Sequence, residues 1–241
     1  MRKLNLLSVD WDFFFPIKES GKDSIFFDWG HKENEFMITV VWPIRALTFL
    51  RNKKRLPRTS GEESDFWSRF NFSSECVLYY TESHSRICSL KEIERIKSIV
   101  SFDAHHDAGY KDDDVKNILK TSVIHCDNWM VYFSFFLSKM KVIYPKWRDY
   151  AMDLEPIPQV SVKREVDTGG PLEGTFDIIF LCRSGAWSPP WLDKKFSRFI
   201  KDCPVKRKIL LDKIIDRSDW RTLTSKTIKV EKNAYERTVG S

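Results

Sequence analysis

The sequence predicts an α/β fold in which a mainly parallel sheet lies between two layers of helices. Two observations point to this fold. Short continuous runs of apolar residues recur along the chain, and segments with helical periodicity lie between them. Continuous apolar runs are typical of strands buried on both faces, as in parallel sheets. Strands that alternate with helices therefore predict a three-layer α/β/α arrangement.

Five apolar runs are expected to form strands, because each is bounded by polar or turn residues. They are Leu4–Val9, Cys76–Tyr80, Ile99–Phe102, Lys141–Tyr144 and Phe176–Cys182. Helices are expected at Pro43–Asn52, Ser89–Ile96, Asn128–Lys139 and Pro189–Lys201. In the second of these, Ser89 and Glu92 have the spacing of a capping box, which predicts a crossover helix between the second and third strands. Residues 18–35 and 55–68 are expected to be long loops, and the last ten residues to be frayed.

The composition favours a cytoplasmic protein with one domain over residues 1–241. Its 241 residues, 42% of them hydrophobic, are enough for one large core. No apolar run reaches the roughly 18 residues of a membrane span, and the chain starts without the apolar region of a signal peptide. Five cysteines without a Cys-x-x-Cys pair indicate a reducing compartment. A net charge of +6 is too small to indicate a dedicated nucleic-acid binder.

The strongest chemical signal lies at the end of the third expected strand. Asp103, His105 and Asp107 follow the apolar residues Ile99 and Val100. Alternate side chains of an extended chain point the same way, so these three are expected to converge. Two carboxylates and an imidazole suit a divalent ion such as manganese, and open α/β sheets place their sites at strand carboxyl ends. The alternative is a hydrogen-bonded turn with solvated carboxylates.

Two further segments place similar residues at strand ends. Asp10 and Asp12 follow the first strand among large aromatic residues, where burial of two carboxylates requires a compensating cation. The alternative is an edge strand whose aspartates face water. His84 follows the second strand; a lone histidine is usually structural, but here the next strand carries Asp103. We expect these two strands to be neighbours, which would bring His84 to the same place.

These motifs resemble those of the arginase and agmatinase (ureohydrolase) superfamily. Asp103-Ala104-His105-His106-Asp107 is similar to its Asp-Ala-His-x-Asp signature, and Glu82-Ser83-His84-Ser85 is a looser match to its Gly-Gly-Asp-His-Ser turn. Ser8-Val9-Asp10-Trp11-Asp12-x-x-x-Pro16 resembles Ser-x-Asp-x-Asp-x-x-Asp-Pro, with Phe15 where the family has Asp. In arginases the Asp-Ala-His strand comes before the Ser-x-Asp-x-Asp strand. The resemblance therefore implies an arginase-like fold with permuted strand order, most similar to the short peptide arginases.

The resemblance also implies an activity and a ligand set. Peptide arginases convert arginine side chains of ribosomally made precursor peptides to ornithine, so an arginine-containing precursor peptide is the expected partner. Two manganese ions are implied, bridged by two aspartates, with one His–Asp pair completing each shell. The bridging residues are Asp103 and Asp10, the first pair is His84 and Asp107, and the second pair is His105 and Asp12.

The residues themselves are consistent with this chemistry. Two metal ions about 3.5–4 Å apart lower the pKa of bound water, so that hydroxide is available at neutral pH to attack a guanidinium. His125, before an expected helix, is the candidate for moving a proton to the departing amine, although a structural histidine in a capping segment is an equal alternative. Asp127, or Glu82 after the second strand, could hold the guanidinium, with Asn128 as a further contact. The loop acids of Glu62-Glu63-Ser64-Asp65 are not excluded by spacing.

Two other classes of function compete with this hypothesis. Paired aspartates and a basic surface also suit a metal-dependent phosphoesterase or nuclease, and related folds include deacylases. A binding protein without turnover is the third class, and it is disfavoured because such a protein need not keep every metal ligand. The sequence does not identify the substrate peptide or the oligomeric state.

Overall fold

A computed structural model describes residues 2–16, 33–53, 55–149 and 155–226. Within these residues, seven parallel strands form one sheet in the order β5-β4-β3-β1-β6-β2-β7. The strands are β1 (Leu4–Asp10), β2 (Asn71–Thr81), β3 (Ile96–Phe102), β4 (Met140–Tyr144), β5 (Lys163–Val166), β6 (Thr175–Cys182) and β7 (Arg207–Leu210). All five predicted strands are confirmed, and so is the three-layer α/β/α fold.

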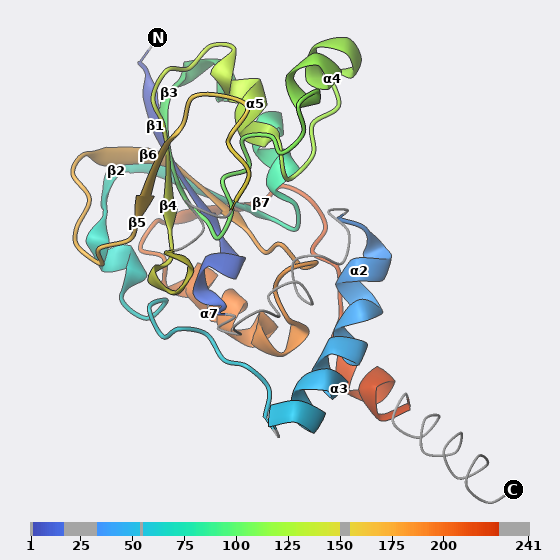
Figure 1. The fold of residues 1–241 in the computed structure, drawn as a ribbon. Helices are drawn as coiled ribbons and strands as arrows, with labels where there is room; N and C mark the ends of the chain where they lie inside the picture. Colours follow the sequence, from blue (N-terminus) through green and yellow to red (C-terminus); the bar gives the residue numbers. More distant parts are fainter. Residues whose placement is uncertain (1, 17–32, 54, 150–154, 227–241) are drawn as a thin grey trace, which may run out of the picture.

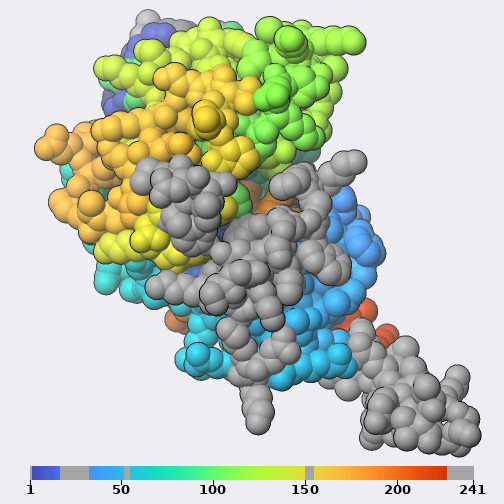
Figure 2. All heavy atoms as spheres, in the orientation of Figure 1, coloured from blue at the N-terminus to red at the C-terminus, as the bar shows by residue number. Residues whose placement is uncertain are grey.

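The α-helices of the described chain are α2 (Glu35–Thr39), α3 (Val41–Lys53), α4 (Asp114–Thr121), α5 (Trp129–Ser134) and α7 (Asp193–Asp202). Short 3-10 turns are η1 (Trp11–Phe14), η2 (Phe66–Arg69), η3 (His84–Ser89), η4 (Ile93–Arg95), η5 (Lys146–Arg148) and η6 (Pro190–Leu192). Figure 1 shows α4 and α5 in the upper part of the molecule and α3 in the lower part. The space-filling view places the α2–α3 region (blue) and the α4 region (green) on one visible side (Figure 2). No helix among the described residues has the length and apolar character to cross a membrane.

The two faces of the sheet are covered by different elements. On one face, Leu6 of β1 belongs to a cluster with Trp129 and Phe133 of α5. On the other face, Leu7 packs in a cluster with Phe66 of η2 and Phe199 of α7. Neighbouring residues of one strand thus contact opposite layers, which is why its apolar run is continuous.

The predicted helix at Ser89–Ile96 is wrong. The structure has two 3-10 turns there, with single bonds such as Leu90 N–H to Ile87 O at 3.3 Å, and β3 already begins at Ile96. The capping box does not form because the Glu92 carboxylate instead accepts a hydrogen bond from the Tyr79 hydroxyl at 3.0 Å. A tertiary contact with β2 therefore overrides the local preference for a helix.

Other boundaries also differ from prediction. The helix expected at Asn128–Lys139 ends at Ser134, because β4 begins at Met140, and helix α4 had no sequence signal that we recognised. The helices expected at Pro43–Asn52 and Pro189–Lys201 are present as α3 and as η6 with α7. The loop expected over 18–35 and the frayed C-terminal residues fall mainly outside the described residues.

Strand register brings several ends to one level. Asp10, the last residue of β1, pairs with Cys182 of β6, and Thr81 of β2 pairs with the same cysteine. On the other side, Val9 pairs with Phe102, the last residue of β3. The segments that follow β1, β3, β6 and β2 therefore leave the sheet side by side at its carboxyl edge.

Candidate metal centre

The six predicted ligands meet at this carboxyl edge and form two groups. In the first group, three carboxylates face one ring nitrogen of His84. Its Nδ1 lies 3.2 Å from Asp10 Oδ2, 3.3 Å from Asp107 Oδ2 and 3.4 Å from Asp103 Oδ2. Within this group, ligand atoms of His84, Asp103 and Asp107 lie close enough together to hold one ion, and Asp10 contacts the same nitrogen of His84. Carboxylate oxygens with an imidazole nitrogen are a suitable set for a divalent ion.

The second group shares one residue with the first. His105 Nδ1 lies 3.1 Å from Asp12 Oδ2 and 3.7 Å from Asp103 Oδ1. The two oxygens of Asp103 thus face different groups, Oδ2 the first and Oδ1 the second. His105 has 18% of its side chain exposed, whereas Asp12 and Asp103 are almost completely buried, so the second group is nearer to solvent.

The first group reaches its geometry differently from our prediction. His84 was expected next to Asp103 because β2 and β3 were expected to be neighbours, but β1 and β6 lie between them. His84 instead begins η3, which turns back over the end of β6, where its ring stacks on Phe180 at 5.6 Å. The ring of Trp129 also stacks on it, with the ring centroids 4.7 Å apart.

The aspartates converge through tight turns rather than through an extended chain. Asp12 lies in η1, and its backbone N–H donates to Asp10 Oδ1 at 3.0 Å. The His105 N–H likewise donates to Asp103 Oδ1 at 2.9 Å. Asp107 has φ 48°, a left-handed conformation that is uncommon for residues other than glycine. The prediction that alternating extended residues aim these side chains is therefore wrong, although the side chains do converge.

The electrostatics of the centre fit bound cations. Asp103 Oδ2 is buried and accepts no hydrogen bond. Burial, with the neighbouring carboxylates of Asp107, Asp10 and Asp12, raises the pKa of Asp103 well above its usual value. Burial and Asp12 also raise the pKa of Asp10 to about 6. Four buried carboxylates at such short range are stable as anions only with compensating positive charge, which bound divalent ions could supply.

His84 is oriented as a metal ligand. Its Nε2 lies 2.7 Å from the Ser8 hydroxyl, a partner that can hold the proton on Nε2 and leave Nδ1 as a ligand. Burial lowers the pKa of His84, but hydrogen bonds to Asp10 and Asp107 outweigh it and raise the pKa to about 9. Without metal, a protonated His84 therefore supplies the positive charge between the carboxylates.

Further side chains hold the ligands from outside. Trp129 Nε1 donates to Asp107 Oδ2 at 2.8 Å, and the Ser184 hydroxyl donates to Asp10 Oδ2. Cys182 lies close enough to Asp10 and His84 to count as a third candidate group. Burial raises the pKa of the Cys182 thiol well above its usual value, and the thiol donates to the Glu82 carbonyl at 3.2 Å, so without metal it is protonated.

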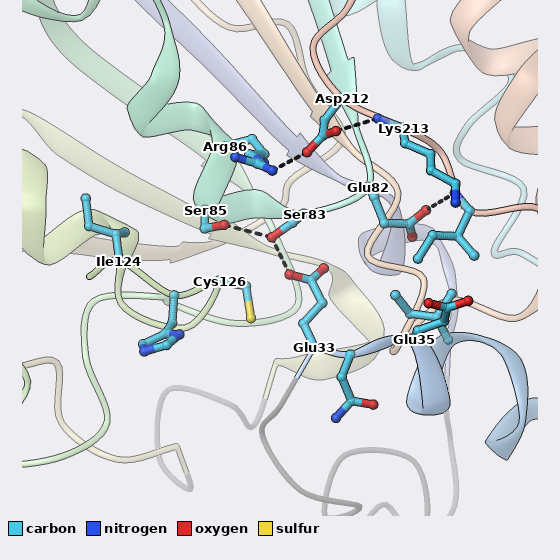
Figure 3. A pocket seen from close by; sticks show the side chains of 14 residues that line it. Glu33, Glu35, Glu82, Ser83, Ser85, Arg86, Ile124, Cys126, Asp212 and Lys213 are labelled. Carbon is cyan, nitrogen blue, oxygen red and sulfur yellow. Dashed lines mark hydrogen bonds and ion pairs between the residues drawn. The ribbon is translucent and has the colours of Figure 1, made fainter. Parts of the chain in front are cut away.

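A pocket of about 700 Å³ lies next to η3 (Figure 3), and none of the six candidate ligands is among its described lining residues. Ser83 and Ser85, on either side of His84, line it, with their hydroxyls 2.9 Å apart. Glu33 enters the pocket and accepts a hydrogen bond from Ser83, while its Oε1 is buried with no hydrogen-bond partner. Burial raises the pKa of Glu33 to about 8. Sequence reasoning missed Glu33 and Trp129, because neither stands in a motif.

Three of the predicted catalytic and substrate-binding residues, His125, Asp127 and Asn128, lie in or near the wall of this pocket. His125 is exposed on the pocket wall, and its backbone N–H donates to the buried Asn128 Oδ1 at 2.8 Å. Asp127 is half-buried beside it, with a pKa raised by burial and then by Asp107. None of these three belongs to a ligand group found among the described residues.

Glu82 also lines the pocket, but its carboxylate is already occupied. Arg183 donates to both of its oxygens, with Arg183 Nε at 3.1 Å from Oε1. The backbone N–H groups of Gly185 and Ile215 donate to it as well, each at 3.0 Å. Of the loop acids considered with it, Glu63 is paired with Lys195 at 2.7 Å. The Arg183 guanidinium therefore occupies the Glu82 carboxylate, which the sequence had suggested for the substrate guanidinium.

No protein-family model, curated protein or solved structure matches this chain.

Proposed function

We propose that this chain is a hydrolase that binds two divalent metal ions, preferably manganese, and converts arginine side chains of a peptide to ornithine with release of urea. One observation carries the proposal. The two carboxylate oxygens of Asp103 face two separate Asp–His groups, one with His84 and one with His105. A shared carboxylate of this kind is what a two-metal site requires.

The donor atoms favour hard or borderline ions. Both groups offer carboxylate oxygens and imidazole nitrogens, and the nearby Cys182 thiol donates to the Glu82 carbonyl. Such a set suits manganese better than a thiophilic ion. A pair of these ions, when bound, supplies Lewis acidity and water of lowered pKa for hydrolysis. The chain holds them through buried, oriented side chains, as catalysis requires.

The pocket next to η3 favours a cationic substrate over a phosphate ester. Glu33 Oε1 is buried there without a hydrogen-bond partner, and its surroundings include the acidic ligand Asp10 and the pocket acid Glu82. A guanidinium can donate to that oxygen in a planar, charge-assisted arrangement. A phosphate ester would instead bring negative charge against the Glu33 carboxyl. We therefore assign Glu33, rather than Glu82 or Asp127, to the substrate guanidinium.

The proposed reaction adds water to the guanidinium carbon and breaks the bond from that carbon to the side-chain nitrogen. That nitrogen leaves as the ornithine amine and takes up a proton. His125 lines the same pocket and is the proposed proton source. The peptide nature of the substrate follows from the resemblance to peptide arginases.

The direct test is mass spectrometry of arginine-containing peptides incubated with the protein and Mn2+. Each converted arginine is expected to lose about 42 Da, because water is consumed, urea is released and the guanidinium becomes an amine. Chelation of the metal should abolish the change. Unchanged masses across diverse arginine peptides, together with metal-dependent cleavage of a phosphodiester, would instead favour the phosphoesterase alternative.

Glu33→Gln tests the substrate assignment. The amide keeps the shape of the side chain but cannot ionise against a guanidinium, so KM for the peptide should rise about 10–100-fold, as expected for loss of a charged hydrogen-bonded pair. Mn2+ content should stay that of wild type. Glu35→Gln is the matched control, because Glu35 lines the same pocket but is exposed. Equal effects of the two variants would remove Glu33 from the proposal.

A further inference from the structure

The segment after β6 carries a strained residue at the metal centre. Ser184 has φ 48°, in the left-handed region, and its hydroxyl donates to Asp10 Oδ2. The other oxygen of Asp10 accepts from the Asp12 N–H at 3.0 Å. Among the described residues only Asp107, Ser122 and Ser184 are non-glycine residues with positive φ, and two of these three lie at the centre. Strain that clusters at a site persists only where its surroundings enforce it.

A buried network of charged side chains enforces the Ser184 conformation. Glu82 binds Arg183 on one side of Ser184 and the Gly185 N–H, at 3.0 Å, on the other. The contact with Gly185 is so close that a Cβ there would collide with Glu82 Oε1. The Gly185 carbonyl is held in turn by Trp42 Nε1 at 2.7 Å. Backbone on both sides of Ser184 is therefore fixed.

Residues near the C-terminal end of the described chain complete the network. The Ile215 N–H donates to Glu82 Oε2 at 3.0 Å, and the Ile215 carbonyl accepts from Arg183 Nη2 at 2.7 Å. Arg217 is fully buried and donates to the carbonyls of Gly185, at 2.6 Å, and Ser188, at 2.7 Å. Its other nitrogens bind the Asp193 carboxylate at 2.6 and 3.0 Å.

We infer that this network, made of Glu82, Arg183, Arg217 and Asp193, positions the metal ligand Asp10 through Ser184. It makes the segment 215–217, which touches no ligand directly, a determinant of metal affinity. The inference rests on the metal centre of the proposed function and is independent of arginine as the substrate. Ser184 and Arg217 are positioning residues: they aim a ligand and do not touch the reacting atoms.

Ser184→Gly separates this role from a purely structural one. Glycine adopts positive φ without strain, so the metal-free variant should melt at the wild-type temperature or above it. The variant lacks the hydroxyl that donates to Asp10, so its Mn2+ affinity should fall about 10–100-fold, the usual effect of losing a hydrogen-bond partner of a metal ligand. Ser122→Gly is the matched control: it relieves the same strain at the end of α4, and its Mn2+ affinity should equal that of wild type.

Arg217→Lys tests the C-terminal part of the network. Lysine keeps the charge but has a single nitrogen, so it cannot bind the Asp193 carboxylate through two nitrogens while a third donates to the two carbonyls. Mn2+ affinity should therefore fall although Ser184 is present. If this variant does not fold, Asp193→Asn weakens the same arginine and should lower the affinity in the same direction. Calorimetric titration with Mn2+ provides the affinity.

Four outcomes are decisive. Wild-type affinity in Ser184→Gly overturns the positioning role of Ser184. Wild-type affinity in both Arg217→Lys and Asp193→Asn overturns the claim that segment 215–217 determines metal affinity. Absence of Mn2+ binding in the wild-type protein contradicts the metal centre itself, and failure to hydrolyse arginine with all affinities as expected contradicts only the proposed function.

Discussion

Mn2+ binding at this centre should strengthen steeply as pH rises, because the metal must displace the proton of His84. The pKa of His84 is raised to about 9 by its bonds to Asp10 and Asp107. At pH 7.5, about 1.5 pH units below that pKa, the competing proton should weaken binding of the first ion about 30-fold relative to the limit at high pH. Below pH 6, where Asp10 also takes up a proton, the dependence should become steeper.

The assay is calorimetric titration with Mn2+ between pH 6.5 and 8.5. The affinity of the first ion should rise about tenfold per pH unit, and titrations in two buffers of different ionisation enthalpy should show release of about one proton. Stability should follow the opposite trend in the metal-free protein. A histidine pKa raised in the folded state stabilises fully below the unfolded value of about 6.5, and this stabilisation is lost as pH rises through about 9. Equal affinities at pH 6.5 and 8.5, with no proton release, would refute the reasoning.

Two substitutions test individual contacts. Trp129→Phe keeps an aromatic ring against His84 but removes the donor to Asp107, so Mn2+ affinity should fall about tenfold in calorimetric titration; an unchanged affinity would show that this bond does not orient the ligand. Asp12→Asn removes a carboxylate that belongs to the second group only, so the number of Mn2+ ions bound at saturation should fall from two to one by metal analysis after gel filtration. Loss of both ions, or of neither, would contradict the division of the ligands into two groups.

The inner strands were predictable from sequence, and the edge strands were not. Leu4–Asp10 and Thr175–Cys182 are buried on both faces, which gives the continuous apolar run that marks such strands. The edge strands β5, with sequence KREV, and β7, with sequence RKIL, are short and largely exposed or half-buried. Their polar residues carry no strand signal, because an edge strand needs only one neighbour and tolerates charge.

The ligands were predictable as residue types at strand ends, but their supports were not. His84 does lie near Asp103 as predicted, but the prediction assumed that β2 and β3 are neighbours, and they are not. Glu82 looked like a substrate acid because the sequence gives no sign that Arg183, which is 101 residues away, occupies it. Glu33 and Trp129 reach the centre and its pocket through long-range contacts that only the folded chain creates, so no local pattern marks them.

The count of bound metal ions tests the two-metal centre most directly. Protein saturated with Mn2+ and freed of excess ion should contain two Mn2+ per chain by elemental analysis. Asp103→Asn removes the shared anionic carboxylate and should bring the count below one, with the fold checked by circular dichroism. One ion or none in the wild-type protein, or two ions in Asp103→Asn, would contradict a pair of metal ions held through Asp103.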